Sequence, residues 1–332
     1  MSNNLSPELI EQVQKSFSGF IGRRILVIGD AVADQFLFGT IDRPSREAPV
    51  FILKHHNTET RPGAAANTAA NISAMGGRAV LLSVVGEDQS GTELKEKLLE
   101  NKVDTSCIIS LGNIQTTRKL RVLAGHQMAA RQQVIRIDYS DDALAVDFPH
   151  DKILKLAAEQ LHLSDAIVFS DYGYGVVSKQ LFEFVNSEAS KRNIPVLVDS
   201  RHNLTLFCGA FAATPNLEEA EEVLQKPLDD NGAKELVAKL GLEVGLITMG
   251  SRGLYITGRN GLFRHIEAFG TKEPVDVTGA GDTVLAAFSM AIAGGASPEI
   301  AAVIANCAGG LSVLKRGTAV VSLEELKNAL VI

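Results

Sequence analysis

The segment Asp276-Val-Thr-Gly-Ala-Gly-Asp-Thr-Val284 joins a glycine-rich turn to an apolar run, residues 285–294, that we expect to be helical. The Gly279-Ala280-Gly281 turn leaves main-chain N–H groups unobstructed at the helix start, and these donors and the helix dipole favour an anion. Asp282 follows directly. A carboxylate beside an anion site indicates phosphoryl transfer to a hydroxyl group whose proton Asp282 removes. The alternative is a tight turn in which Asp282 only caps the helix.

On both sides of this segment, short apolar runs alternate with longer amphipathic stretches. The runs are nearly continuous in apolar residues, as in strands buried on both faces, and they span residues 24–29, 79–85, 166–170, 195–199, 211–214 and 245–249. The expected helices include residues 91–101, 151–163, 178–191 and 231–240. Strand followed by helix, repeated, predicts an α/β fold with a parallel sheet covered on both faces.

Each predicted strand ends in a small or polar residue. Examples are Asp30, Asp88, Asp171, Asp199, Asn216 and Gly250. Ligands of open α/β sheets bind outside the carboxyl ends of the strands. One such residue means little, because Asp and Asn also cap helices. Six on one edge predict that the active face lies there.

Two regions, residues 36–60 and 105–138, contain strand patterns without intervening helices. Their polar and apolar residues alternate, which predicts strands with one solvated or partner-facing side. Residues 49–53, 108–110, 119–123 and 133–138 are the expected strands. They form either an antiparallel extension of the main sheet or a small β lid over the active face.

The composition of the chain argues against several classes of protein. The 332 residues suit one large domain or two modest ones, and the formal net charge of −7 argues against DNA or RNA as the main partner. The longest apolar run is half of what a membrane span needs. Three cysteines, far apart and in no CxxC pair, favour a reducing compartment. With a polar, acidic first segment, they lead us to expect a cytoplasmic protein.

Other catalytic classes lack their signatures. The sequence has no Gly-Lys dipeptide for a P-loop and no clean GxGxxG helix start for a dinucleotide-dependent oxidoreductase. His55 and His56 are adjacent in a probable strand, so their side chains face opposite ways and do not form a metal pair. A non-catalytic sugar sensor stays an alternative, although it would have no use for a base such as Asp282.

The string Asp276–Thr283 resembles the C-terminal signature of the PfkB (ribokinase-like) carbohydrate kinases. Further strings of that family stand in family order: Gly29-Asp30 with Asp34, Arg61–Asn67, Val85–Asp88, Thr214–Glu219, Ile247–Gly253 and Asn306. The resemblance implies a three-layer αβα sandwich with a mostly parallel central sheet plus a small β lid. It also implies one kinase domain over residues 1–332, with the lid formed from about 36–60 and 105–138.

The resemblance assigns roles residue by residue. Asp282 would be the catalytic base, and the anion hole would consist of Gly279, Ala280 and Gly281. The nucleotide site for ATP would include Asn216, Thr248, Gly250, Gly253 and Asn306. Asn216 and Glu219 would organise Mg²⁺, with Glu219 as a plain surface acid the alternative. Sugar hydroxyls would be held by Asp34, Gly63 and Asn67. Asp276 and Thr278 resemble the monovalent-cation loop of many members, which implies K⁺.

Several strings look most like the heptose kinases of ADP-heptose and lipopolysaccharide synthesis. These are Ser45–Val50, Arg61–Gly63, Lys119–Leu123, Gln132–Asp138 and Ser170–Gly175. Those enzymes phosphorylate the anomeric hydroxyl of heptose 7-phosphate to give heptose 1,7-bisphosphate. The lid supplies cations for such a phosphate: Arg118, Lys119, Arg121, Arg131 and Arg136. Glu47 and Asp171 are candidates for heptose hydroxyl contacts. The alternative is a PfkB kinase for another sugar, sugar phosphate or nucleoside, similar to ribokinase or fructokinase.

The chain departs from these patterns at three places. Ala64 replaces the second glycine of the family's usual Pro-Gly-Gly. Tyr174 stands where the heptose kinases have lysine, and Asp199-Ser-Arg201 stands where they have Asp-Pro-Lys. Many relatives are also fused to a nucleotidyltransferase with an HxGH motif, which is not found here. We therefore expect another polypeptide to carry out that later transfer. The lid's exposed strands predict a homodimer in which two lids pair, since an uncovered edge is a pairing liability.

Overall fold

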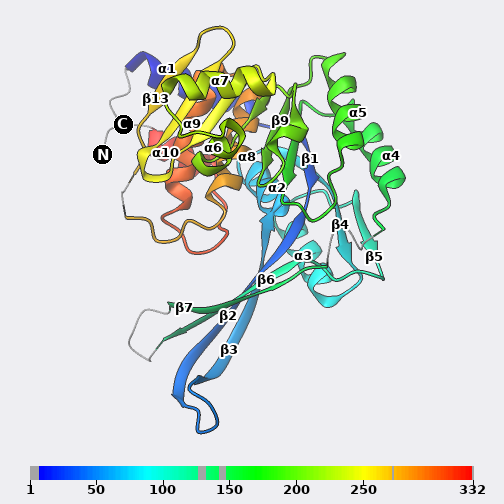
Figure 1. Ribbon diagram of the computed structural model, residues 1–332, viewed down its shortest axis with the longest axis vertical. Helices are drawn as coiled ribbons and strands as arrows, with labels where there is room; N and C mark the ends of the chain where they lie inside the picture. Colours follow the sequence, from blue (N-terminus) through cyan, green and yellow to red (C-terminus); the bar gives the residue numbers. More distant parts are fainter. Residues whose placement is uncertain (1–6, 126–131, 142–146, 271–272, 331–332) are drawn as a thin grey trace.

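The computed structural model describes residues 7–125, 132–141, 147–270 and 273–330, which form two sheets flanked by helices (Figure 1). The larger sheet contains, in spatial order, β13 (Phe263–Ile266), β12 (Leu254–Gly258), β11 (Val244–Thr248), β10 (Ala212–Ala213), β9 (Val196–Ser200), β8 (Ala166–Asp171), β1 (Arg24–Gly29), β4 (Arg78–Gly86) and β5 (Ile108–Leu111). The strands from β11 to β5 are parallel, and β12 and β13 are antiparallel. This arrangement confirms the predicted α/β class.

Both faces of the larger sheet are buried. In β1, Ile25 and Val27 pack into one apolar cluster, whereas Leu26 and Ile28 pack into a second one on the opposite face. Because successive side chains of a strand point to opposite faces, burial on both requires a continuous apolar run. The six runs predicted from the sequence all form strands of this sheet.

Helices form the two outer layers. The first cluster is covered by α1 (Pro7–Ser16), α2 (Ala65–Ala74), α3 (Gln89–Glu100), α8 (Ala280–Ala293), α9 (Pro298–Ser312) and α10 (Leu323–Leu330). The second is covered by α4 (His150–Leu161), α5 (Lys179–Ser190), α6 (Leu217–Leu224) and α7 (Asp230–Leu240). Short 3₁₀ turns span Phe17–Gly19, Leu204–Phe207 and Gly250–Arg252. The result is the expected three-layer αβα sandwich. No helix within the described ranges is long and apolar enough to cross a membrane.

The smaller sheet projects from the rest of the molecule (Figure 1). Its strands, in spatial order, are β3 (Phe51–Ala64), β2 (Ala31–Pro44), β6 (Arg118–Gly125) and β7 (Gln132–Tyr139). Strand β2 leaves β1 directly after Asp30, so the base of this sheet stands at the carboxyl edge of the larger one. The β2–β3 pairing shifts register at Phe38/Gly39 and again at Ile41/Arg43.

Two local expectations are corrected. Residues 108–110 were expected in the lid, but β5 pairs in parallel with β4 and extends the larger sheet, with Ile109 buried against its core. The apolar character that suggested a lid strand arises from this burial. The helix expected over 285–294 begins earlier, at Ala280, so Asp282 lies in its first turn.

Candidate active site

Asp282 is fixed at the N-terminal end of α8. Gly279, the residue before the helix, has φ +77°, and a Cβ there would come within 2.5 Å of the Asn67 amide nitrogen. Glycine is therefore required both by the backbone conformation and by the close approach of α2. The carboxylate that follows is 2% exposed. The turn thus places a buried acid at a helix N-terminus.

Both carboxylate oxygens of Asp282 accept a hydrogen bond. The Asn67 amide donates to Oδ2 over 2.9 Å, and the Tyr172 hydroxyl donates to Oδ1 over 2.6 Å. Burial raises the pKa of Asp282 to about 7, against the lowering effect of these two donors. A carboxylate with a pKa near neutrality suits a general base, because it can take up a proton at the working pH.

The backbone at Gly281 is open to a ligand. A Cβ built there would meet no protein atom within 4 Å. Protein packing therefore gives no reason for glycine at this position, whereas a ligand that approaches the main chain does. The Ala280 N–H donates to the Val277 carbonyl over 3.3 Å, whereas the N–H groups of Gly281 and Asp282 precede the first helical hydrogen bond of α8 and can receive an anion.

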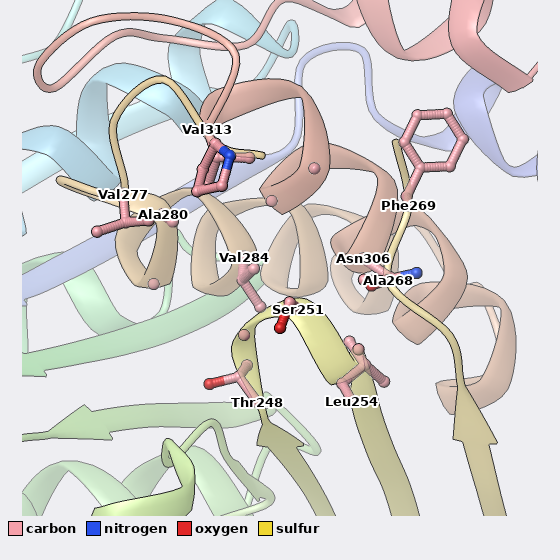
Figure 2. A pocket seen from close by; sticks show the side chains of 16 residues that line it. Thr248, Ser251, Leu254, Ala268, Phe269, Val277, Ala280, Val284, Asn306 and Val313 are labelled. Carbon is pink, nitrogen blue, oxygen red and sulfur yellow. The ribbon is translucent and has the colours of Figure 1, made fainter. Parts of the chain in front are cut away.

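A cavity of about 210 Å³ opens beside this turn (Figure 2). Its lining brings together the predicted residues Thr248, Gly250, Gly253, Ala280, Gly281 and Asn306. Its walls are mainly apolar, with Leu254, Phe269, Val277, Val284 and Val313. The Asn306 amide donates to the Glu267 carbonyl over 2.8 Å, which fixes its side chain at the wall. Apolar walls with few polar groups, next to an anion site, suit a heteroaromatic base joined to phosphates.

The predicted metal pair caps a helix. Asn216 Oδ1 accepts from the Glu219 N–H over 2.9 Å, and Glu219 Oε2 accepts from the Asn216 N–H over 2.8 Å. This is a capping box at the start of α6. A second acid lies close by: burial and the charge of Glu219 raise the pKa of Asp199 to about 7. A divalent cation near this end of α6 would relieve the repulsion between these two carboxylates.

The predicted sugar residues at the base of the smaller sheet lie together. Arg121 donates to Asp34 over 2.5 Å in a buried ion pair. Gly63 leaves room for that carboxylate, since a Cβ there would come within 2.7 Å of Asp34 Oδ2. Burial raises the pKa of Asp34, although the Arg121 charge opposes the shift. This ion pair lies near Asp282, and the Arg121 charge partly neutralises that of Asp34.

Two predicted sugar contacts are placed differently. Asp171 is buried and its oxygens accept from the Ser200 hydroxyl (2.8 Å) and the Gly173 N–H (3.1 Å), so it stabilises its own loop. Glu47 is exposed in the turn between β2 and β3. Ten residues of β2 separate the end of that strand at Pro44 from Asp34, or about 30 Å of extended chain. The structure does not bring Glu47 to Asp282 within one chain.

A sequence model of the pfkB family carbohydrate kinases matches residues 23–326. The chain belongs to this family. It is therefore a carbohydrate kinase, a phosphotransferase with an alcohol group as acceptor, and its family implies ATP as the phosphoryl donor.

Two curated relatives are each identical to the kinase at more than a third of the aligned positions. It is 35% identical to the bifunctional protein HldE of Koribacter versatilis over 99% of this chain and 67% of that protein. It is 36% identical to the HldE of Gluconobacter oxydans, over 92% of this chain and 64% of that protein. The kinase thus spans about two thirds of the length of these relatives.

Solved structures confirm the ribokinase-like fold of the kinase. Arabidopsis thaliana ribokinase, complexed with ribose and ATP, matches with a TM-score of 0.72 and 19% identity, covering 94% of this chain and 99% of that chain. Escherichia coli phosphofructokinase-2, in complex with potassium, matches with a TM-score of 0.72 and 17% identity, covering 93% and 98%.

The site of the kinase also contains residues to which the sequence assigned no role. Tyr172 contacts Asp282, Asp199 lies beside Glu219, and Asp30 accepts three backbone N–H groups from the loop after β8. Each of these three residues ends or closely follows a predicted strand, at the carboxyl edge of the larger sheet. That position in the sequence is the signal by which they could have been found. Their partners are distant in the sequence, so no local pattern could assign the contacts.

Proposed function

We propose that the kinase transfers the γ-phosphoryl group of ATP to the anomeric hydroxyl of heptose 7-phosphate and yields heptose 1,7-bisphosphate. The observation that carries this proposal is Asp282, a buried carboxylate with a pKa raised to about 7 at the open N-terminus of α8. The strings shared with heptose kinases support the choice of sugar.

In this proposal Asp282 accepts the proton of the attacking sugar hydroxyl. The amides of Gly279, Ala280 and Gly281 stabilise negative charge on the transferring phosphoryl group. Asp34, Gly63 and Asn67 surround the sugar, with Asn67 acting mainly on Asp282 through its amide. Thr248, Gly250, Gly253 and Asn306 hold the nucleotide.

Magnesium would neutralise charge on the phosphates when bound. Asn216 and Glu219 would hold it together with the nucleotide, because no group of three metal-ligating side chains occurs among the described residues. The raised pKa of Asp199 beside Glu219 supports a cation at this place.

The 7-phosphate needs cations, and the structure narrows the choice among those of the lid. Arg121 is committed to Asp34 and Arg136 to Asp138, while Arg131 lies outside the described residues. Lys119 has no carboxylate partner within ion-pair distance in the described part of the chain. Its ammonium lies 5.7 Å from the centre of the Tyr172 ring and 5.9 Å from that of Tyr174.

Arg201 lies over the same Tyr172 ring at 5.0 Å. Burial lowers the pKa of Lys119, and the charge of Arg201 lowers it further. Two cations that repel each other across one ring suit a dianionic phosphate, which would relieve the repulsion. We therefore assign the sugar phosphate to Lys119 and Arg201.

A second candidate is a kinase for an unphosphorylated sugar. Two observations favour it: Arg121 is already neutralised by Asp34, and Tyr174 stands where heptose kinases have lysine. A panel assay of ATP consumption with heptose 7-phosphate, fructose, ribose, fructose 1-phosphate and adenosine decides between the two. Turnover with heptose 7-phosphate alone supports the first function, and preference for a neutral sugar overturns it.

Charge-removal variants sharpen this test. Lys119→Met and Arg201→Met should each raise KM for heptose 7-phosphate about tenfold or more, since each removes a charge-assisted contact. Arg118→Met is the matched control, because its guanidinium lies over Tyr139 at 3.8 Å, away from Tyr172. An equal rise in KM for all three variants would contradict the assignment.

We also propose a K⁺ site at Asp276 and Thr278. Asp276 accepts from the Thr278 N–H (2.9 Å) and the Gly317 N–H (2.8 Å), which joins two loops beside α8. The buried hydroxyl of the neighbouring Thr318 has no partner within the described residues, so it fits a cation ligand. Activity should rise on replacing Na⁺ with K⁺, and Asp276→Asn should abolish that rise.

Finally, we propose a homodimer that forms through the lid. Strands β3 and β7 are the edges of the smaller sheet, and they expose apolar side chains: Phe51, Ile52, Val134, Ile135 and Ile137. Pairing of two lids would cover these edges. A monomer by light scattering at micromolar concentration would contradict this proposal.

A further inference from the structure

The Tyr172 hydroxyl contacts the candidate base directly. It donates to Asp282 Oδ1 over 2.6 Å, while Asn67 takes the other oxygen. Burial and the charge of Asp282 raise the pKa of Tyr172 well above its ordinary value of 10, so this phenol stays protonated and remains a donor. Tyr172 therefore acts on Asp282 throughout the neutral pH range.

We propose that Tyr172 is a positioning residue that keeps Asp282 oriented and ionised for proton removal, and that Asp30 in turn holds Tyr172 in place. The proposal rests on the assignment of Asp282 as the base. In the step itself the sugar O–H bond breaks and a carboxyl O–H bond forms on Asp282. The phenol keeps its own proton.

The loop that carries Tyr172 is arranged around the Asp30 carboxylate. Three backbone N–H groups donate to it: Tyr172 and Tyr174 to Oδ2 over 2.8 and 3.1 Å, and Val176 to Oδ1 over 3.2 Å. Asp30 follows Gly29, at which a Cβ would come within 2.0 Å of the Ser170 carbonyl oxygen. The end of β1 and the loop after β8 are thus held together, and the position of the phenol is set by the main chain.

The other charged groups around Asp282 make this donor necessary. Asp199 on β9 and Asp34 on β2 face the carboxylate, and both oppose its ionisation. The hydrogen bonds from Tyr172 and from Asn67 on α2 oppose these charges and the effect of burial, and they favour the ionised carboxylate. Arg201 and Lys119 lie over the Tyr172 ring and add positive charge near its hydroxyl. Removal of one donor therefore leaves the carboxylate much easier to protonate.

The direct test titrates Asp282 in the unliganded kinase and needs no substrate. The protein is labelled with ¹³Cγ-aspartate, and the Asp282 resonance is the one that Asp282→Asn removes. The wild-type signal should titrate near pH 7, and Tyr172→Phe should shift its midpoint upward by about one to two pH units. Tyr174→Phe is the matched control in the same loop and should leave the midpoint in place. An unshifted midpoint in Tyr172→Phe, or an equal shift in Tyr174→Phe, overturns the proposal.

The pH dependence of kcat/KM distinguishes a positioning role of Tyr172 from a general disturbance of the active site. In Tyr172→Phe the acidic limb of the kcat/KM profile should move to higher pH. Activity at pH 6.5 should then fall about tenfold or more and recover in large part above pH 9. A loss that is equal at all pH values contradicts the proposed role. If wild-type kinase does not phosphorylate heptose 7-phosphate, the proposed function fails, but the titration still decides the role of Tyr172.

A second measurement applies if Tyr172→Phe does not fold. The chain has only four tyrosines, so all can be replaced biosynthetically by 3-fluorotyrosine. Fluorine withdraws electrons from the phenol and strengthens it as a donor. The Asp282 midpoint should then move to lower pH, and a midpoint that stays in place overturns the proposal.

Discussion

Asn67 and Asp282 are 215 residues apart in the sequence, yet their side chains lie 2.9 Å apart in the structure. Asn67 is itself held by Asn71, whose amide donates to its backbone and side-chain oxygens over 3.0 and 3.1 Å. Asn71 also accepts from the Val321 N–H over 2.9 Å. Segments from the start and the end of the kinase thus fix the orientation of one carboxylate.

Replacement of that carboxylate should stop catalysis without loss of the fold. Asp282→Asn keeps the shape of the side chain but removes the base, so kcat should fall about 10²–10⁴-fold. Sugar affinity by isothermal titration should change little. Asp151→Asn, at an exposed position in the first turn of α4, is the control and should retain full activity. Retained turnover in Asp282→Asn would show that another group is the base.

The two glycines of the helix start should respond differently to alanine. At Gly279, alanine meets both a positive φ and the Asn67 amide, so Gly279→Ala should lower the free energy of unfolding by about 2 kcal/mol. At Gly281 a Cβ meets no protein atom, so Gly281→Ala should be as stable as wild type or more so.

Gly281→Ala should nevertheless weaken ATP use, because its methyl group faces the proposed phosphate site. Urea unfolding and KM for ATP measure the two effects. Unchanged kinetics in a stable Gly281→Ala would place the phosphates elsewhere.

Ala64 carries backbone strain that glycine should relieve. It precedes α2 with φ +55° and ψ −130°, a conformation that favours glycine. Relief of about 1–3 kcal/mol of strain exceeds the roughly 0.5–1 kcal/mol entropic cost of glycine. Ala64→Gly should therefore raise the thermal midpoint by about 2 °C. Ala65→Gly, one residue further in helical backbone, should lower it, and a lower midpoint in both would contradict the strain.

Asp199 should make stability depend on pH. Its pKa is about 7 in the folded protein and near 3.8 when unfolded, so the folded state binds the proton more tightly. Stability is therefore fully present below pH 4 and falls as pH rises to about 7. Asp30 and Asp282, whose pKa values are raised to about 6 and about 7, contribute in the same direction.

Asp199→Asn should remove part of this decline. We expect the variant to be about 1–3 kcal/mol more stable than wild type at pH 8, with little difference at pH 4. Its activity should fall if Asp199 helps to hold magnesium. Urea denaturation at the two pH values provides the measurement. A variant less stable than wild type at pH 8 would show that the carboxylate is not under strain.

The sequence predicted those parts of the fold that have a local signature. Strand β8 ends at Asp171, as its apolar run indicated. Of the residues predicted to bind the nucleotide, Thr248, Gly250, Gly253 and Asn306 line one cavity, and Asn216 does not. The assignment of β5 to the lid was wrong, because a strand of four residues, three of them apolar, carries no information on which sheet it joins.

Contacts between distant segments could not be predicted in this way. Tyr172 is 110 residues from Asp282, and nothing near it in the sequence distinguishes its hydroxyl from that of Tyr174. Likewise, the acid at position 34 and the arginine at position 121 meet only because β2 and β6 are neighbours in the smaller sheet.

The two register shifts in the β2–β3 hairpin separate an inner part, up to Phe38, from an outer part, beyond Gly39. The inner part places Asp34 opposite Arg61, and the outer part ends where Pro44 faces Phe51. A bulge absorbs an added residue locally. Insertions and deletions beyond Gly39 therefore leave the inner pairing intact. The outer part of the hairpin, and with it the proposed dimer contact, can then change in evolution while the inner residues near Asp282 stay the same.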